Sequence, residues 1–259
     1  MDLPKNAFKT AIAEGRTQLG LWSALRDTGA SEMLAGCGFD WIVLDCEHSA
    51  RDVQEVLTGL QAMAPYPVQP VVRVKSLDVA EIKKMLDAGA QSILVPYVQN
   101  AEEARLAAAA VTYPPEGLRG VAGAVRANRY GAIPDYFTRA RDEICLIVQI
   151  ETREAMDNLE EIAAVDGIDG IFIGPADLAA SLGHPGDMKH PEVTAAIADA
   201  IRRVRAAGKP AGFLSADDEL MAMALEAGCT FAAIDIDIVA LRRIVTTRLT
   251  KYRQEILRE

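Results

Sequence analysis

Two acidic side chains follow neighbouring apolar segments near the middle of the sequence. Glu151 comes directly after the segment Cys145–Ile150, and Asp177 follows Gly170–Ile173. If both segments are parallel strands, Gln149 points to the same side as Glu151, because side chains alternate along a strand. Two carboxylates with open positions between them suit a hard divalent cation such as Mg²⁺ or Mn²⁺. The same carboxylates could instead cap the helices that follow them, and the spacing leaves both interpretations open.

A second group of polar residues lies at the ends of two earlier apolar segments. Asp45 is the last residue of one of them and His48 follows it, and Arg73 lies near the end of the next. An aspartate beside a histidine can fix the imidazole tautomer and leave its other nitrogen free as a base near neutral pH. A buried arginine requires a negative partner, which could be Glu47 or an oxyanion of a substrate.

The segment GPADLAASLG, which begins at Gly174, combines a tight turn with the start of a helix. Gly174 and Pro175 shape the turn, and free backbone N–H groups then open the helix, which makes a seat for a carboxylate or phosphate. With Asp177 on a metal ion, this seat would place a 2-oxo acid so that its carboxylate and C2 oxygen chelate the ion. Helix capping without a ligand is the alternative, but it does not explain the Gly-Pro pair.

Regularly spaced apolar runs supply the elements that must position these side chains. Each run is continuously apolar, as expected for strands buried on both faces. The predicted strands are Leu19–Trp22, Trp41–Asp45, Pro70–Val74, Ser92–Pro96, Cys145–Ile150, Gly170–Ile173, Pro210–Phe213 and Phe231–Ile234. The predicted helices between them include Ala50–Met63, Val79–Ala88, Ala101–Val111, Thr152–Ala163 and Glu192–Ala207. Eight such units in about 250 residues predict an α/β fold, a single (β/α)8 TIM barrel over residues 1–259, with its reacting groups at the carboxyl ends of the strands.

Details of the connections support a closed barrel. The segment SALRDTGA after Trp22 lacks the glycine-rich phosphate turn of an open, doubly wound sheet. In AGCGFDWIVL, DAGAQSILV and EAGCTFAAI we expect a glycine to end each helix in the left-handed conformation. The stretch from Tyr113 to Glu143 is long for a connection, so we expect it to be functional. A long final helix is predicted over Ile238–Glu259, where it could pack on a neighbouring subunit.

Composition excludes several classes of partner. The formal net charge is −10, whereas a nucleic-acid-binding protein requires a basic face. No apolar run approaches the roughly 18 residues of a membrane span, and the N-terminal sequence indicates a short capped helix, not a signal peptide. None of the four cysteines forms a C-x-x-C pair, so we expect reduced core thiols in a cytoplasmic protein. His184 and His190 lie in polar loop sequence, where surface roles are expected.

Six segments together resemble the HpcH/HpaI aldolase family, in the family's order and over nearly the whole chain. They are LDCEH around Asp45–His48, VVRV around Arg73, ILVPYVQNAEEA at Ile93–Ala104, RGVAGAVRANRYG at Arg119–Gly131, VQIET at Val148–Thr152 and GPADLAASLG at Gly174–Gly183. The resemblance implies a barrel of the phosphoenolpyruvate/pyruvate type. It also implies a class II pyruvate aldolase that cleaves a 4-hydroxy-2-oxo acid to pyruvate and an aldehyde, with oxaloacetate decarboxylation as a side activity.

The resemblance assigns a cofactor and its ligands. Glu151 and Asp177 are implied to bind a divalent metal, which could be Mg²⁺, Mn²⁺ or Co²⁺, with Gln149 next to the metal or its water. The substrate carboxylate is then expected at the backbone of Ala176 and Asp177.

The catalytic roles follow from the same resemblance. His48 is implied to be the base, with Asp45 as its partner, and Arg73 to stabilise the enolate. Leu214 and Trp22 are expected to line the substrate pocket. The sequence does not identify the aldehyde.

Family members are usually homohexamers, built as a trimer of dimers. The resemblance therefore implies that the last helix is exchanged between neighbours and that Asp87 approaches the site of an adjacent subunit. The sequence departs from the family at Asp235, where the family often has glycine. This departure means that the aldehyde preference of the family does not carry over to this chain.

Three alternatives remain to be weighed. A class I aldolase would need a Schiff-base lysine, and Lys75 after the third predicted strand is flanked by polar loop sequence. An acyl-CoA lyase of the citramalyl or malyl type would need a larger, more basic groove. A non-catalytic barrel subunit would not need the whole set of polar residues at the strand ends.

Overall fold

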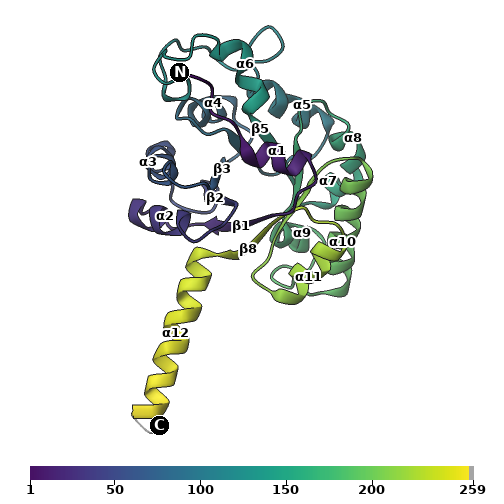
Figure 1. The fold of residues 1–259 in the computed structure, drawn as a ribbon. Coiled ribbons are helices and arrows are strands. Elements are labelled where there is room, and N and C mark those ends of the chain that lie inside the picture. The colour runs from purple at the N-terminus through teal and green to yellow at the C-terminus, as the bar shows by residue number, and fades with distance from the viewer. Residues whose placement is uncertain (257–259) are drawn as a thin grey trace.

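A computed structural model of the chain, which describes residues 1–256, shows a closed barrel of eight parallel strands (Figure 1). Each strand pairs with the strands before and after it in the chain, and β8 pairs with β1. The strands are β1 (Gln18–Ser23), β2 (Trp41–Asp45), β3 (Gln69–Arg73), β4 (Ser92–Val95), β5 (Cys145–Ile150), β6 (Gly170–Ile173), β7 (Ala211–Leu214) and β8 (Phe231–Ile236). The predicted TIM barrel is confirmed, and every predicted strand overlaps its observed counterpart.

Helices surround the barrel, as the alternation in the sequence predicts (Figure 1). They are α1 (Ala7–Ala13), α2 (Thr28–Ala35), α3 (Val53–Met63), α4 (Val79–Asp87), α5 (Ala101–Ala110), η1 (Arg126–Asn128), α6 (Tyr136–Glu143), α7 (Arg153–Asp157), α8 (Leu159–Ala163), α9 (Pro175–Ser181), α10 (Pro191–Ala206), α11 (Asp218–Glu226) and α12 (Asp237–Ile256). The predicted helix Thr152–Ala163 is divided into α7 and α8, because the backbone at Asn158 is not helical. Residues 257–259 of the predicted last helix lie outside the described residues.

Capping side chains mark the first turns of several helices, and glycines follow the ends of others. The side chain of Asp52 caps α3 and that of Asp217 caps α11, each accepting backbone N–H groups of the first turn. At the returns to β2, β4 and β8, Gly38, Gly89 and Gly228 have φ values of 91°, 98° and 107°. Because side chains strongly disfavour this left-handed region, the predicted glycine ends are confirmed.

Large side chains fill the interior of the barrel below the carboxyl ends of its strands. The rings of Trp41 and Phe172 lie 5.9 and 6.0 Å from that of Phe231. Phe8 of α1 enters from the amino ends of the strands, 5.4 Å from Trp41. A Cβ atom at Gly212 would overlap the Phe231 ring. The interior is therefore a packed core and not a pore.

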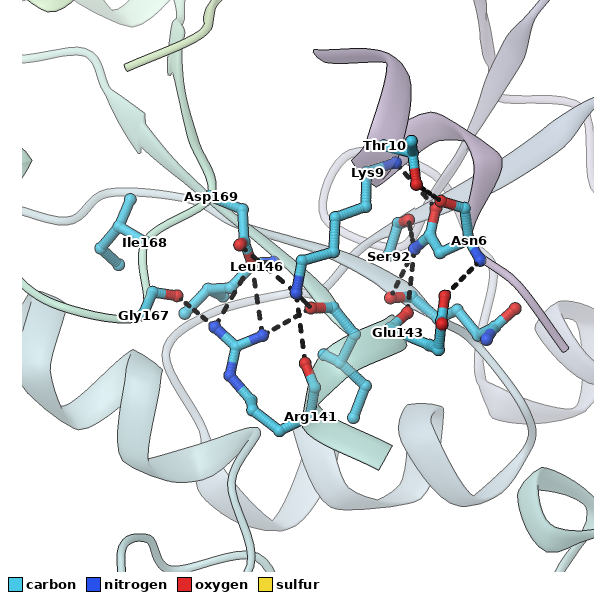
Figure 2. A network of polar contacts seen from close by, with 12 residues as sticks. Asn6, Lys9, Thr10, Ser92, Arg141, Glu143, Leu146, Gly167, Ile168 and Asp169 are labelled. Carbon is cyan, nitrogen blue, oxygen red and sulfur yellow. Dashed lines mark hydrogen bonds and ion pairs between the residues drawn. The ribbon is translucent and has the colours of Figure 1, made fainter. Parts of the chain in front are cut away.

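A network of polar contacts holds α1 against the amino-terminal end of the barrel. Figure 2 shows the side chains of Lys9 and Arg141 both reaching toward Asp169. Lys9 Nζ donates to the carbonyl oxygens of Arg141 and Ile144 at 3.2 and 2.8 Å. Arg141 Nη2 donates to the Gly167 carbonyl at 2.6 Å and to Asp169 Oδ2 at 3.3 Å. These contacts close the end of the barrel that lies opposite the predicted site.

The last helix leaves the barrel instead of packing along it (Figure 1). α12 contacts β1 and β8, and most of its length extends away from the other elements. Its exposed apolar side chains include Ile244, Val245, Leu249 and Ile256. Its exchange between subunits stays a prediction. Within residues 1–256, no helix has both the length and the hydropathy needed to cross a bilayer.

One expectation about the cysteines is wrong. Cys46, Cys145 and Cys229 are buried thiols, but Cys37 is exposed. Cys37 lies in the turn that follows α2, where the chain runs over the surface before Gly38 returns it to the barrel.

Candidate active site

A cavity of about 620 Å³ opens at the carboxyl ends of the strands, and we call it the catalytic pocket. With the exception of Asp87, every residue predicted for the site lines it. These residues are Trp22, Asp45, His48, Arg73, Gln149, Glu151, Gly174, Pro175, Ala176, Asp177 and Leu214. The structure therefore brings together side chains from six strand ends that are nearly 200 residues apart in the chain.

Glu151 is the most deeply buried carboxylate of the pocket. It follows β5 and is 1% exposed. Its Oε1 accepts the backbone N–H of Tyr97 at 2.8 Å. Burial raises the pKa of Glu151 to about 7, and the negative charges of Glu47 and Asp177 contribute to the rise. The charge of Arg73 offsets this rise only in part, and a divalent cation would supply further positive charge.

Tyr97 connects the two predicted metal-binding carboxylates. Its N–H contacts Glu151, and its hydroxyl oxygen lies 3.4 Å from Asp177 Oδ1. Its φ of 56° is in the left-handed region, which turns the chain toward the pocket two residues after β4 ends. The sequence interpretation missed this residue, although it follows a strand end as the predicted site residues do.

Gln149 and Gly174 form a tight wall beside Glu151. Gln149 Nε2 donates to Glu151 Oε2, and Gln149 Oε1 is buried without a hydrogen-bond partner among the described residues. A Cβ atom at Gly174 would overlap Glu151 Oε2 and would lie 2.6 Å from Gln149 Nε2. The glycine is therefore required by the close approach of the carboxylate. Unlike α3 and α11, α9 has no side-chain cap, because its N-cap residue is Gly174.

Gly174→Ala should lower kcat/KM by on the order of a hundredfold, because the new methyl group displaces the Glu151 carboxylate by about 1 Å. Gly36→Ala is the matched control, since its Cβ would lie no closer than 3.4 Å to the Tyr66 ring. Steady-state kinetics on both variants checks this expectation. Equal activity of the two variants would show that the position of Glu151 does not limit turnover.

Arg73, at the end of β3, is fixed by two carboxylates and an aromatic ring. Its Nε and Nη2 donate to Asp45 Oδ1 and Oδ2 at 2.9 and 2.8 Å. Its Nη1 lies 2.6 Å from Glu47 Oε2, and its guanidinium stacks 4.7 Å from the centre of the Trp22 ring. Burial alone would raise the pKa of Asp45, but the hydrogen bonds and charge of Arg73 outweigh it and lower that pKa. The predicted ion pair with Glu47 is present, and Asp45 is a second partner.

The predicted pairing of the Asp45 and His48 side chains is wrong. Asp45 Oδ1 accepts the backbone N–H groups of Glu47 and His48 at 3.0 and 3.4 Å, and its carboxylate is otherwise engaged by Arg73. The nearest carboxylate to the imidazole is Glu47, whose Oε2 lies 3.7 Å from His48 Nε2. The His48 side chain lines the pocket wall and is 64% exposed, so a substrate in the pocket can contact its imidazole directly. No buried carboxylate in the described part of the chain orients the imidazole ring.

The remaining wall of the pocket is mainly apolar and was not predicted. It includes Phe172, Met188, Ile236 and Val239. Sequence alone gave no signal for these residues, because buried apolar side chains occur throughout the chain. Arg243 of α12 lies at the edge of this wall and forms an ion pair with Asp235.

Three further residues lie outside the catalytic pocket. Asp87 ends α4 and accepts a hydrogen bond from the buried Arg119 at 3.0 Å. The rings of His184 and His190 stack with centroids 3.5 Å apart. His184 Nε2 lies 3.0 Å from Glu192 Oε2, and His190 caps α10. One possible ligand atom from each of His184, His190 and Glu192 lies within 4.8 Å of the other two, so these side chains form a group that could hold a metal ion.

The comparison with known families agrees with this arrangement. The profile of the HpcH/HpaI aldolase/citrate lyase family matches residues 18–243, which include every residue of the catalytic pocket. The chain belongs to the HpcH/HpaI aldolase family. As a member of that family it is an enzyme, an aldolase of the lyase class.

Individual relatives of this HpcH/HpaI aldolase cover nearly its whole length. It is 55% identical to the hydroxypyruvate/pyruvate aldolase of Sagittula stellata, over 97% of this chain and 100% of that protein. It is also 55% identical to the 4-hydroxy-2-oxo-heptane-1,7-dioate aldolase of Klebsiella pneumoniae, over 92% of this chain and 90% of that protein. A crystal structure of a family member from Burkholderia cenocepacia is 37% identical and superimposes with a TM-score of 0.93, covering 96% of this chain and all of that one.

Proposed function

We propose that this enzyme is a class II pyruvate aldolase, which cleaves a 4-hydroxy-2-oxo acid to pyruvate and an aldehyde and catalyses the reverse addition. The observation that carries the proposal is the pair formed by the buried Glu151 and the half-buried Asp177, joined through Tyr97 at the wall of the catalytic pocket. The names of the relatives from Sagittula stellata and Klebsiella pneumoniae support pyruvate as the common product. Among the described residues that line the pocket there is no lysine, which disfavours a Schiff-base mechanism.

Glu151 and Asp177 would hold the divalent metal, with the buried Gln149 Oε1 facing the metal or its water. The donor set fits Mg²⁺, Mn²⁺ or Co²⁺, because all of these donors are oxygen atoms and the catalytic pocket leaves positions open for water and substrate. When bound, such an ion acts as a Lewis acid toward the 2-oxo group. The substrate carboxylate would lie at the backbone N–H groups of Ala176 and Asp177, where α9 begins without a side-chain cap.

The residues of the chain supply the proton transfer and the orientation. His48 removes the proton of the C4 hydroxyl group, and the C4–O bond becomes the carbonyl of the aldehyde as the C3–C4 bond breaks. The electron pair of that bond remains with C3 as the pyruvate enolate. Protonation at C3 then gives the methyl group of pyruvate.

Arg73 stabilises the enolate oxygen, and Asp45 and Glu47 hold its guanidinium in place. Three of its nitrogen atoms are engaged by these carboxylates, but Nη1 and Nη2 each retain a second N–H. Asp45 is therefore a positioning residue for Arg73 in this proposal. Trp22 fixes the plane of the guanidinium from one side.

The decisive experiment assays retro-aldol cleavage of several 4-hydroxy-2-oxo acids after EDTA treatment and after addition of each metal. We expect EDTA to abolish the release of pyruvate and Mg²⁺, Mn²⁺ or Co²⁺ to restore it. Full turnover after exhaustive chelation would contradict the proposal. Borohydride trapping of pyruvate on the chain would indicate a class I aldolase with a Schiff-base lysine. Cleavage of malyl-CoA alone would indicate an acyl-CoA lyase. No turnover of any compound would indicate a non-catalytic barrel.

Arg73→Lys should lower kcat by on the order of a hundredfold, because lysine keeps the charge but loses the planar fork. Arg141→Lys is the matched control at the other end of the barrel, where the guanidinium also engages a carboxylate, Asp169. We expect the control to lower the melting temperature without changing kcat. If Arg73→Lys likewise changed only the melting temperature, the residue would have a structural role alone.

We further propose that the enzyme is a homohexamer, a trimer of dimers, in which α12 packs on a neighbouring barrel. The exposed apolar residues of α12, such as Ile244 and Leu249, support this assembly. Asp87, held by Arg119, would then approach the catalytic pocket of an adjacent subunit. Sedimentation velocity of the full chain tests the hexamer, and a monomer at micromolar concentration would contradict it.

A further inference from the structure

A second cavity, of about 220 Å³, lies at the amino-terminal end of the barrel, and we call it the basic cavity. Residues 3–5, the end of α3, the starts of β3 and β4, η1 and α6 form its wall. The described residues that line it include Lys5, Arg126 and Arg129 but no aspartate or glutamate. In a chain whose formal net charge is −10, a cavity wall with only positive charges requires an explanation.

Other basic residues at this end of the barrel already have acidic partners. Lys5 Nζ lies 2.6 Å from Glu143 Oε1. Lys9 and Arg141 share Asp169, at 3.5 and 3.3 Å (Figure 2). The nearby carboxylates Glu143 and Asp169 are therefore occupied.

Arg126 and Arg129 differ from these residues. Arg126 Nη1 donates to the backbone oxygen of Ala88 at 2.8 Å, and its guanidinium has no carboxylate partner within residues 1–256. The side chain of Arg129 makes no hydrogen bond or ion pair in the same range. Burial lowers the pKa of Arg126, and the charge of Arg129 lowers it further, so the two guanidinium groups repel each other. An anion between them would remove this repulsion.

We propose that the basic cavity binds a small oxyanion with two negative charges, held by the guanidinium groups of Arg126 and Arg129. Guanidinium groups bind the oxygen pairs of carboxylates and phosphates through two parallel hydrogen bonds. The volume corresponds to about seven water molecules at roughly 30 Å³ each. It is below the range of about 300–1,000 Å³ that holds drug-sized ligands. Phosphate or a short dicarboxylate therefore fits, whereas a larger ligand such as a nucleotide does not.

The basic cavity is separate from the catalytic pocket. The two share no lining residue, and they lie at opposite ends of the strands. β3, for example, begins at Gln69 beside the basic cavity and ends at Arg73 in the catalytic pocket. Binding to one can therefore be measured independently of chemistry in the other.

The experiment measures thermal unfolding of the full chain, freed of metal with EDTA, in rising concentrations of sodium phosphate. Sodium malonate replaces phosphate in a second series, and sodium chloride keeps the ionic strength constant in both. An anion that binds only the folded state raises the melting temperature in a saturable way. We expect such a rise, with one anion bound per chain in calorimetric titration. A rise in melting temperature with phosphate alone would identify a phosphate group as the ligand. A rise with malonate alone would identify a dicarboxylate.

Two double variants assign the response to the proposed residues. Arg126→Met with Arg129→Met should weaken anion binding at least tenfold. Arg105→Met with Arg202→Met is the matched control, because it removes the same charge from exposed positions outside the cavity and should bind as the unmodified chain does. Arg126→Lys with Arg129→Lys keeps the charges but loses the planar forks, so it should bind more weakly than the unmodified chain even if the methionine variant fails to fold. An equal response in the lysine variant and the unmodified chain, or no saturable response in the unmodified chain, would overturn the proposal.

Discussion

Glu151→Gln and Asp177→Asn should each lower kcat/KM for aldol cleavage by on the order of a thousandfold at limiting metal, since each removes one of the two charged oxygen ligands of the proposed metal site. Calorimetric titration with Mn²⁺ should show weaker binding in both variants. Asp217→Asn is the matched control, because Asp217 also lines the catalytic pocket but is paired with Lys189 at 2.6 Å. Unchanged Mn²⁺ affinity in Glu151→Gln would remove this residue from the metal site.

The raised pKa of Glu151 adds a test that does not depend on turnover. Burial raises this pKa to about 7 in the folded chain, whereas an unfolded glutamate titrates near its ordinary value of 4.5. The neutral carboxyl therefore favours folding below about pH 4.5, and this contribution is lost as pH rises through 7. In EDTA at pH 8, Glu151→Gln should be more stable than the unmodified chain by up to about 3 kcal/mol. With saturating Mg²⁺ the unmodified chain should instead be the more stable of the two. If Glu151→Gln were less stable than the unmodified chain in EDTA, the ionised Glu151 carboxylate would not destabilise the fold.

His48→Ala should lower aldol cleavage by about 10²–10⁴-fold while it preserves much of the decarboxylation of oxaloacetate. Aldol cleavage requires a base for the C4 hydroxyl proton and a group that stabilises the enolate. Decarboxylation requires only the second, because carbon dioxide leaves without a hydroxyl group to deprotonate. The two rates, measured on one preparation of the variant, separate the base from the rest of the site.

Two comparisons make this test specific to His48. His184→Ala changes a histidine outside the catalytic pocket and should leave both rates unchanged. Glu151→Gln should impair both reactions together. If His48→Ala reduced both rates equally, the histidine would help to build the site and would not act as its base.

The strands and the places of Glu151 and Asp177 in the pocket could be predicted because their signals are local. Strands buried on both faces read as continuous apolar runs, so the bounds of β2, β5 and β6 follow directly from the sequence. Glu151 and Asp177 then follow from their places after two of these strands. A parallel barrel collects all such strand ends at one edge, which places Trp22 and Leu214 in the same pocket.

Other contacts of the site could not be predicted, because they depend on the three-dimensional arrangement of residues that are distant in the sequence. Arg73 has two carboxylates within reach, and the two-pronged geometry with Asp45 engages the carboxylate that sequence spacing had assigned to His48. Tyr97 reaches the site because of a left-handed backbone conformation, which no local residue pattern signals in a tyrosine. Arg243 reaches the pocket edge from the second turn of α12, a helix that leaves the barrel after β8, and no local residue pattern signals that direction.

The order in which the pocket's walls occur along the chain also sets when catalysis can begin during protein synthesis. A ribosome that has delivered residues 1–230 has already made Glu151, Asp177, His48 and Arg73, but not β8. Without β8, β1 lacks the neighbour that closes the barrel, so the Trp22 wall is not yet held opposite Glu151 and Asp177. Nascent chains released before this point should bind neither substrate nor metal in the native arrangement, and the first turnover must await the last strand.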